Sequence, residues 1–581
     1  MKYDIVIVTH NSTEWLQGCF SALSRLDYDK QELHIIVVDN NSAFDTQKTL
    51  VYLQEKYKMF GAFDILVQKK NYGFGKACNI GAKAGNAPYI FMLNVDTKIE
   101  PDALKEMDIA IRRDEYGICG AFEMRQKPVE MGRHNDPATM ECSWNSGACV
   151  VYRREVYENL GGFDENMFMY CEDVDLSWRI RASGYKLIYV PRSGVFHYTR
   201  RNDNKKEFQE YIFTTYNRLM MRYKYGDLKD RKDGRREYIH AIKMPRYFPF
   251  VRRVLLKNYI KHYFNIWPFY SWRFKNRDLV KRIPSTYIEG FEIMRNLYQF
   301  EPLRETPLVS IIIRTSNRPD VLRLTLQALR HQTYRNFEVI VQEDGSADAR
   351  KMIEEEFGDL KIYYEATGEK VGRSKVGNLA LARAKGEFFN FLDDDDFLYP
   401  EHIELMLASF EKYPDADFIV NGYMLFKQDT ISISPYHFTV KAREYHAPAR
   451  LDILTMCKQD QIPILSAMFR RHLYVKMGGL REDIDSNEDW GMWLRFLTLK
   501  PKYYTNNRAT CAFVFPADNG EVDERIRSYR VNYDKVFEDK DLVFEFTARE
   551  LNKMYNDNLV DMKNLVESGG INGFLNDNLA Y

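Results

Sequence analysis

Several features that mark specialised proteins are missing from this chain of 581 residues. Lys plus Arg and Asp plus Glu number 83 each, so the charge balance favours neither a nucleic acid nor another highly charged partner. The eight cysteines form no CxxC pair, and six lie at or before Cys171, which predicts reduced thiols rather than zinc ligands or disulfides. No run of sequence approaches the ~20 apolar residues of a membrane span, and the opening MKYDIVIV lacks the pattern of a signal peptide. We therefore expect a cytoplasmic protein that binds no nucleic acid.

The chain does contain a long internal repeat. LNVDTKIEP, at Leu93–Pro101, returns as LDDDDFLYP at Leu392–Pro400. Further blocks recur in the same order with similar spacing: 4–12 and 310–318, 34–42 and 337–346, Gly73 and Gly372, Asn79 and Asn378, 160–179 and 477–495. A repeat of this length indicates duplicated domains, because the units of a solenoid run to only ~20–50 residues.

Each copy has short runs rich in Val and Ile, separated by helical patterns. This alternation predicts an α/β fold built from βαβ units with a mostly parallel sheet. A chain of this length should form two or three domains. We predict a first α/β domain over 1–225, a helical connector over 226–306, a second α/β domain over 307–515 and a helical tail over 516–581.

The connector differs in composition from both copies. Between Arg235 and Arg282 it has thirteen Lys or Arg against two acids, with many aromatic residues. One interpretation is a helical linker with solvated charges. Another is a surface that rests on an anionic membrane, with apolar groups at the interface and basic groups over the headgroups. Basic and aromatic residues together also suit single-stranded nucleic acid, although no recognition module accompanies them.

Polar residues follow the predicted strands of both copies. Ligands of open α/β sheets bind beyond the carboxyl ends of the strands, so such residues are candidate contacts for a nucleotide. Ordinary turn chemistry is the alternative for the acids, and a plain loop before a helix is the alternative for the glycines. The candidates are Thr9, Asn11, Asp39, Asn71, Gly73 and Asn79 in the first copy, and Thr315, Asn317, Glu343, Asp344, Gly372 and Asn378 in the second.

An acidic cluster ends one apolar strand in each copy. Asp96 of the first copy corresponds to Asp395 of the second, and Asn94 corresponds to Asp393, with Asp394 between the two acids. Hard oxygen ligands suit Mg²⁺ or Mn²⁺, which would also bind phosphate oxygens and offset the charge of a departing nucleotide diphosphate. Four consecutive Asp residues repel one another unless a cation lies there. A solvated acidic turn is the alternative.

A Glu-Asp pair opens a predicted helix in each copy, at Glu172–Asp173 and at Glu488–Asp489. Acids are favoured at a helix N-terminus by its dipole, which is the structural interpretation. The functional one is a general base that takes a proton from an acceptor hydroxyl. Adjacent helix residues point about 100° apart, so we expect one acid of each pair to face the substrate. His197 is either structural or a further metal ligand, and the second copy has no counterpart.

These blocks together resemble the inverting family-two glycosyltransferases with a GT-A fold. The landmarks are Thr-His-Asn at 9–11, Val-Val-Asp at 37–39, Asn-x-Gly-Phe-Gly at 71–75, the N-x-D or D-x-D cluster and the Glu-Asp helix, in the family's order. The resemblance covers about 200 residues of each copy. Two departures are Glu343, where the family usually has Asp, and the missing second histidine.

The resemblance implies two Rossmann-like GT-A domains that bind nucleotide sugars. It makes Asp96 and Asp395 ligands of the metal and diphosphate. From the residues themselves, we predict His197 and Asp393 as further metal ligands. Asp173 and Asp489 become catalytic bases, and Asp39 and Glu343 become contacts of the nucleobase. The first copy looks like bacterial rhamnosyltransferases that use dTDP-rhamnose. Tandem enzymes of this sort act in cell-wall and capsular polysaccharide assembly.

We accordingly predict a bifunctional, inverting, metal-dependent glycosyltransferase that uses Mn²⁺ or Mg²⁺ and a dTDP- or UDP-sugar. Its acceptor would be a lipid-linked glycan, and the chain would lie peripherally at the inner face of the plasma membrane, with a homo-oligomer left open. In one alternative, only one domain is active and the other holds the glycan. In another, the chain is a carbohydrate-binding assembly protein without turnover.

Overall fold

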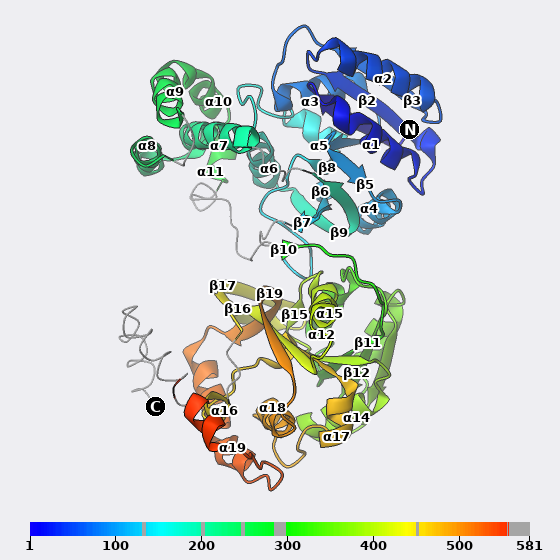
Figure 1. The fold of residues 1–581 in the computed structure, drawn as a ribbon, viewed down its shortest axis with the longest axis vertical. Coiled ribbons are helices and arrows are strands. Elements are labelled where there is room, and N and C mark those ends of the chain that lie inside the picture. Colours follow the sequence, from blue (N-terminus) through cyan, green and yellow to red (C-terminus); the bar gives the residue numbers. More distant parts are fainter. Residues whose placement is uncertain are drawn as a thin grey trace. The chain divides into compact units, whose positions relative to one another are not determined.

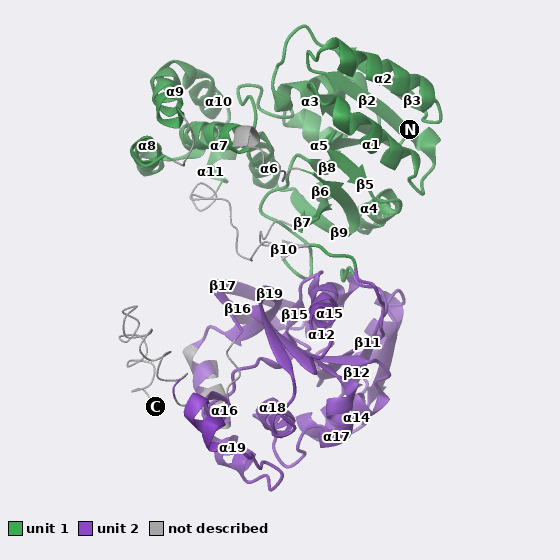
Figure 2. Cartoon of the chain, in the orientation of Figure 1, with its two compact units in different colours: residues 1–302, 331–333 green, residues 303–330, 334–581 purple. Residues whose placement is uncertain are grey.

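The computed structural model describes residues 1–130, 135–198, 204–245, 250–283, 298–448, 453–554 and 556. The chain folds as two compact units (Figure 2). Unit one comprises residues 1–302 with 331–333, and unit two comprises 303–330 with 334–581. Parts of the predicted connector, at 246–249 and 284–297, and most of the tail beyond 554 lie outside the described residues.

Unit one is built on an eight-stranded sheet (Figure 1). Its strands lie in the order β3 (Ala62–Val67), β2 (Leu33–Asp39), β1 (Tyr3–Thr9), β4 (Tyr89–Leu93), β8 (Cys149–Arg153), β6 (Cys119–Lys127), β9 (Lys186–His197) and β5 (Thr97–Ile99). The helices are α1 (Thr13–Ser24), α2 (Phe44–Lys56), α3 (Phe74–Ala84), α4 (Ala103–Arg113), α5 (Arg154–Asn159), α6 (Glu172–Ala182) and α7 (Asn204–Tyr225). The short strands β7 (Val129–Glu130) and β10 (Tyr298–Gln299) pair with each other.

Unit two repeats this strand order. Its sheet runs β13 (Ile362–Ala366), β12 (Phe337–Glu343), β11 (Val309–Thr315), β14 (Phe388–Asp393), β18 (Ala467–Arg470), β16 (Phe418–Ile433), β19 (Tyr503–Pro516) and β15 (Phe397–Leu398), and β17 (Tyr436–His446) pairs with β16. The helices are α12 (Pro319–Arg330), α13 (Arg350–Glu356), α14 (Arg373–Arg383), α15 (His402–Lys412), α16 (Ile453–Met456), α17 (Arg471–Met477), α18 (Glu488–Thr498) and α19 (Asn519–Phe537). The prediction of two α/β domains of the same kind is confirmed.

Both sheets are mixed, so the expectation of a mostly parallel sheet holds for only part of each sheet. In unit one, β1, β2, β3 and β4 form a parallel group, whereas β8 runs antiparallel to both β4 and β6, and β5 runs antiparallel to β9. The sequence signal came from β1, β2 and β4, which are buried on both faces and read as continuous apolar runs.

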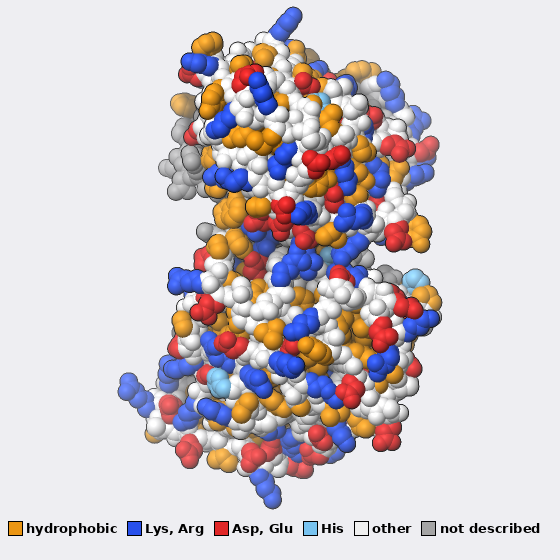
Figure 3. Space-filling view, turned by 90° about the vertical axis from the view of Figure 1, so that its right-hand side faces the viewer, with side chains coloured by type: hydrophobic (Ala, Val, Ile, Leu, Met, Phe, Trp, Pro, Cys, Tyr) orange, Lys and Arg blue, Asp and Glu red, His pale blue; other side chains and the backbone are white. Residues whose placement is uncertain are grey.

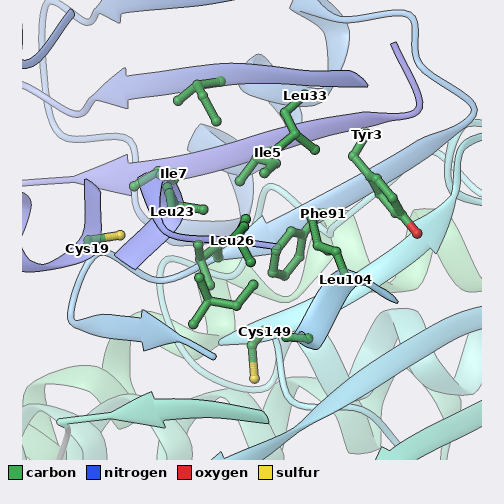
Figure 4. Packing of buried hydrophobic residues seen from close by; sticks show 14 of the residues in the cluster. Tyr3, Ile5, Ile7, Cys19, Leu23, Leu26, Leu33, Phe91, Leu104 and Cys149 are labelled. Atoms are coloured by element: carbon green, nitrogen blue, oxygen red, sulfur yellow. The ribbon is translucent and has the colours of Figure 1, made fainter. Parts of the chain in front are cut away.

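Alternate residues of the central strand β1 point into separate cores. Tyr3, Ile5 and Ile7 pack against α1 and its neighbours, among them Leu23 (Figure 4). Val6 faces the opposite layer, which holds apolar residues of α3, α5 and α6. This arrangement follows from the two-residue period of a strand. It leaves the ends of the strands as the edge at which loops and helix N-termini gather.

The connector is mainly helical, with α8 (Leu228–Lys243), α9 (Val251–Asn265), α10 (Trp267–Lys275) and α11 (Arg277–Lys281). These helices do more than link two domains. Val251, Leu255 and Phe269 share one apolar cluster with Trp178 of α6 and Leu219 of α7. The connector therefore forms a helical layer of unit one that supports the helix carrying Glu172 and Asp173.

No helix among the described residues is long and apolar enough to cross a membrane. Figure 3 shows basic and acidic side chains interspersed on one face, with apolar side chains between them.

Candidate functional site

In unit one, two of the predicted metal ligands lie next to each other. Residue pairing between β5 and β9 places Thr97 opposite His197, and this register brings His197 Nε2 to 3.3 Å from Asp96 Oδ1. Asn94 Nδ2 lies 3.5 Å from the same ring nitrogen. Strand pairing alone therefore assembles three of the residues that the sequence singled out.

The hydrogen bond of His197 to Gln126 indicates which ring nitrogen carries the proton in the neutral imidazole. Gln126 Nε2 donates to Glu123 at 3.4 Å, which leaves Gln126 Oε1 to accept from His197 Nδ1 at 2.8 Å. In the neutral imidazole, Nε2 then carries a lone pair facing the carboxylate of Asp96. Two electron-pair donors facing each other fit a shared cation, and an outer hydrogen bond of this kind is typical of metal-binding histidines.

No group of three or more His, Cys, Asp or Glu side chains in the described parts of the chain forms a complete metal site. A divalent cation at Asp96 and His197 would need further ligands, and the oxygens of a nucleotide diphosphate are of the right type. The unit-one residues thus fit a metal that binds together with its substrate.

The Glu-Asp pair of unit one divides into a buried and an accessible acid. Glu172 is buried beside Gly75, and its Oε2 has no hydrogen-bond partner within the described parts of the chain. Burial, with the charge of Asp173, raises the pKa of Glu172 well above its usual range. Asp173 is only partly buried, and its Oδ2 accepts from the backbone N–H of Gly147 at 2.9 Å. Asp173 is therefore the acid of this pair that can act as a base.

Asp173 is joined to the pair Asp96 and His197 by one short segment. Gly147 bonds to Asp173, and the carbonyl of the next residue, Ala148, accepts from the backbone N–H of Asn94 at 2.8 Å. The N-terminus of α6 is thereby held at the end of β4, where Asp96 follows. The Asp173 carboxylate and the candidate cation site are thus linked through Gly147 and Ala148.

The glycine before α3 is required by its surroundings. Gly73 has a φ of +85°, and a Cβ there would lie 2.2 Å from the carbonyl oxygen of Phe168. The next residue, Phe74, donates its N–H to the same carbonyl at 2.8 Å. The loop that begins α3 is therefore fixed against the loop that leads to α6. In unit two, Gly372 also has a positive φ, of +99°, before α14.

Asn79 and Asn378 perform the same positioning task in their units. Asn79 donates to the carbonyl of Phe163 at 2.9 Å and accepts its N–H at 3.0 Å. Asn378 makes the equivalent pair with Leu480, at 2.9 and 2.7 Å. Because both amides are occupied by backbone, we assign them to fixing the loop before α6 or α18 rather than to holding a nucleotide directly.

Asp39 is fully buried, and both its oxygens have donors. The N–H of Ser42 lies 3.0 Å from one, and Nε2 of Gln47 lies 2.9 Å from the other. These contacts agree with ordinary turn chemistry, the alternative that the sequence left open for Asp39. Asn11 supports the same turn by accepting from the N–H of Ala43 at 2.7 Å. Thr9 is buried, and no described residue forms a hydrogen bond with its Oγ1.

The residue after Asp39 was missed by the sequence reasoning. Asn40 accepts from the N–H of Tyr72 at 2.9 Å and donates to Asn71 Oδ1 and the carbonyl of Gly73, both at 3.0 Å. Its counterpart Asp344 accepts from the N–H groups of Val371 and Gly372 at 2.6 and 3.2 Å. The signal was present, since both units place an Asx residue one position beyond the acid.

Unit two differs sharply in its acidic cluster, because arginines lie among the acids. Arg314 donates to Asp393 Oδ1 at 2.7 Å and to Glu488 Oε1 at 2.7 Å. Arg373 lies 3.8 and 3.7 Å from the same two carboxylates. Although burial opposes ionisation, Arg314 and then Arg373 hold the pKa of Asp393 below its usual value.

The other half of the cluster contains Arg318. It forms ion pairs with Asp394 and with Asp395, the latter at 3.4 Å. Thr315 donates to Asp394 at 2.6 Å, and Asn317 lies next in the turn with a φ of +53°. Burial raises the pKa of Asp394 to about 7 despite Arg318. The sequence predicts a divalent cation that relieves the repulsion of four aspartates, but the structure places guanidinium groups there. The residues do not fit a metal in the way that those of unit one do.

The Glu-Asp pair of unit two is also divided. Glu488 is buried against Arg314, and Asp489 is partly buried with its Oδ1 accepting from the N–H of Trp490 at 2.9 Å. Burial and the charge of Glu488 raise the pKa of Asp489 to about 7, against the opposing effect of Arg314. Asp460, another acid that sequence reasoning missed, has its pKa raised by burial and by Asp489.

We predict that transfer by unit two depends on pH near neutrality. A base must be unprotonated, so a raised pKa of Asp489 means that activity rises with pH through about 7. Because Asp460, Glu488, Arg314 and Asp393 surround this group, the measured midpoint belongs to the coupled set. In an Asp173→Asn background, the rate should increase between pH 5 and about 8. A flat profile down to pH 5 would show that Asp489 is not the base.

The model of the family "Glycosyl transferase family 2" matches residues 4–229 and 310–474, most of both units. An uncharacterized glycosyltransferase of Rickettsia typhi is 31% identical over 201 residues, covering 34% of this chain and 61% of the relative's length. The N-acetylglucosaminyl-diphospho-decaprenol L-rhamnosyltransferase of Mycobacterium tuberculosis is 26% identical over 238 residues, covering 33% and 75%. Rhamnosyltransferase WbbL of Escherichia coli is 25% identical over 240 residues, covering 36% and 86%.

Among solved structures, that of S. aureus TarS in complex with UDP-GlcNAc is 18% identical with a TM-score of 0.32, covering 49% of this chain and 83% of that one. The family model accounts for well over half of the residues and matches both copies of the repeat. This protein is a tandem member of glycosyl transferase family 2.

Proposed function

We propose that unit one transfers a sugar from a nucleotide-sugar donor to a hydroxyl group of a glycan acceptor. The observation that carries this proposal is the link, through Gly147 and Ala148, between the partly buried carboxylate of Asp173 and the cation-fitting pair Asp96 and His197. The oxygen of the acceptor hydroxyl forms a bond to the anomeric carbon of the donor sugar. Asp173 accepts the proton that this hydroxyl loses. The bond from that carbon to the diphosphate oxygen breaks on the opposite face, so the configuration inverts.

Asp96, His197 and Asn94 would hold Mn²⁺ or Mg²⁺, which when bound offsets the negative charge on the departing diphosphate. The donor we favour is dTDP-rhamnose, or otherwise a UDP-sugar, because two relatives are named rhamnosyltransferases. One of those names specifies a lipid-linked acceptor, and we propose the same class here. Release of dTDP or UDP from a donor panel, with a synthetic lipid-linked acceptor, tests this activity. No release with any donor would reject it.

We further propose that unit two is a second transferase, with Asp489 as its base. The alternative is that unit two only holds the glycan. The products of single variants distinguish these two possibilities. If both units turn over, Asp173→Asn and Asp489→Asn should each give a different truncated product, whereas a holding unit would tolerate Asp489→Asn.

The connector helices suit a peripheral contact with an anionic membrane. Leu256, Ile260, Tyr263, Phe264 and Trp267 recur every three or four residues and are 50 to 80% exposed. The opposite face of α9, with Val251 and Leu255, is buried against α7 and α8. An outward apolar stripe on a helix that already has an inner packing face fits the interfacial region of a bilayer.

Basic residues border this stripe. Arg253, Lys257 and Lys261 follow one another at four-residue intervals and are exposed. Arg252 instead bonds to the carbonyls of Ile242 and Lys243 at the end of α8, so it supports the fold. Anionic headgroups would balance the three exposed charges.

We expect the triple variant Arg253→Gln, Lys257→Gln, Lys261→Gln to bind anionic vesicles about 100-fold more weakly, because each basic residue contributes ~1 kcal/mol. Sedimentation with vesicles of rising anionic lipid content measures this. The matched control removes Lys229, Lys232 and Arg236 from α8, where acids alternate with the basic residues. Equal binding by the triple variant and the wild type would indicate a connector with solvated charges.

A further inference from the structure

The two units balance their acidic strand ends in different ways. Repeat alignment places Val8, Ser12 and Phe74 of unit one opposite Arg314, Arg318 and Arg373 of unit two. Three uncharged residues near the acidic strand end of unit one therefore correspond to three arginines in unit two.

Each of these arginines reaches the acids that the repeat equates with metal ligands. Arg314 is 6% exposed and lies between Asp393 and Glu488, with contacts of 2.7 Å to both. Arg318 contacts Asp395 at 3.4 Å as well as Asp394. A divalent cation bound by Asp393 or Asp395 would lie beside these guanidinium groups, and like charges at such separations repel.

Two of the three arginines remain accessible. The side chain of Arg318 is 37% exposed and that of Arg373 is 50% exposed, whereas Arg314 is buried. Arg373 begins α14 directly after Gly372, whose N–H is held by Asp344 at the end of β12. The planar guanidinium group offers paired N–H donors that match phosphate oxygens, and it never loses its charge at ordinary pH.

An independent feature at the same sheet edge also indicates a ligand. Glu343, which ends β12 next to Asp344, is fully buried, and its Oε1 has no hydrogen-bond partner among the residues that the structure describes. Its Oε2 accepts from the N–H of Ala349 at 3.1 Å and from the hydroxyl of Tyr364. A buried acceptor without a donor is costly, and a ring N–H of a nucleobase would supply the missing donor.

We propose that unit two binds the diphosphate of a nucleotide sugar through Arg318 and Arg373 without a divalent cation, so that metal binding is confined to unit one. This inference rests on the proposed function, in which both units bind nucleotide sugars. Arg314 stays with Asp393 and Glu488 as a fixed positive charge beneath the site. The two accessible guanidinium groups supply the positive charge that a metal supplies in unit one.

The first test counts bound Mn²⁺ by electron paramagnetic resonance of the free ion, with UDP or dTDP present. We expect one Mn²⁺ per chain, lost in the variant Asp96→Asn, His197→Gln and retained in Asp395→Asn. Two Mn²⁺ per chain, or loss of the bound ion in Asp395→Asn, would overturn the inference.

The second test measures nucleotide binding by calorimetry in EDTA. We expect one bound nucleotide per chain in EDTA and two with Mn²⁺, because Asp96 and Asp173 repel a diphosphate that lacks its cation. The double variant Arg318→Gln, Arg373→Gln should weaken binding in EDTA at least about ten-fold. The matched control Lys412→Gln, Lys476→Gln removes two exposed charges of unit two elsewhere and should bind as the wild type does.

If the glutamine variant fails to fold, as judged by circular dichroism, Arg318→Lys, Arg373→Lys keeps the charges and loses only the paired donors. Weaker binding in EDTA by this variant supports the inference, and unchanged binding contradicts it. Absence of nucleotide binding in EDTA by the wild type also contradicts it. Binding as expected without any sugar transfer would reject the proposed function and leave the inference standing.

Discussion

Replacing Asp173 by Asn is expected to slow sugar transfer by unit one by ~10²–10⁴-fold, the usual cost of losing a general base. The amide keeps the size of the side chain and can still accept from the N–H of Gly147, but it cannot take a proton from the acceptor. Donor affinity should change little, because Asp96 and His197 are untouched. The loss should therefore fall on kcat rather than on KM.

The measurement is best made in an Asp489→Asn background, so that only unit one turns over. Asp102→Asn is the matched control, because Asp102 is an exposed acid that precedes α4 and makes no capping hydrogen bond. Its rate should equal that of the background. A rate within a factor of about two of the background for Asp173→Asn would mean that this carboxylate is not the base. Glu172 is a poor substitute, because it is buried with a raised pKa.

The repeat made much of this architecture predictable. Matching positions of polar residues after apolar strands placed Asp96, Asp173 and their counterparts at strand ends and helix starts, where they are found. Such features are local, because neighbouring residues encode both a strand and the N-terminus of a helix. The pairing of Asp96 with His197 is not local. It depends on the register of β5 and β9, which no short segment specifies.

The arginines of unit two illustrate what sequence reasoning overlooked. Arg314 follows three consecutive Ile residues in a strand that is buried throughout, and a buried charge requires a partner. That partner could have been sought among the four aspartates, yet the sequence was interpreted only in terms of a metal. The connector was likewise interpreted by its composition. Its inner apolar face became visible only when Leu255 and Trp178 were seen in one cluster.

The buried charge of Arg314 also predicts a large effect on stability. Replacing it by Met would leave Asp393 and Glu488 without their closest cation, at 2.7 Å each. Breaking a buried ion pair from one side typically destabilises a protein by about 3–5 kcal/mol, because the remaining charge stays desolvated. We expect a loss of this size in the free energy of unfolding of unit two, with unit one unaffected.

Urea unfolding followed by tryptophan fluorescence measures this loss, since Trp490 and Trp493 are buried in unit two. Arg373→Met is the matched control, because its half-exposed side chain is 3.7–3.8 Å from the same acids, and an exposed pair contributes at most about 1 kcal/mol. The triple variant Arg314→Met, Asp393→Asn, Glu488→Gln should recover most of the stability, because it removes the stranded charges together with the arginine. A loss in the free energy of unfolding below about 1 kcal/mol for Arg314→Met would contradict this prediction. It would mean that Arg373 offsets the charges of Asp393 and Glu488, or that water solvates them, without Arg314.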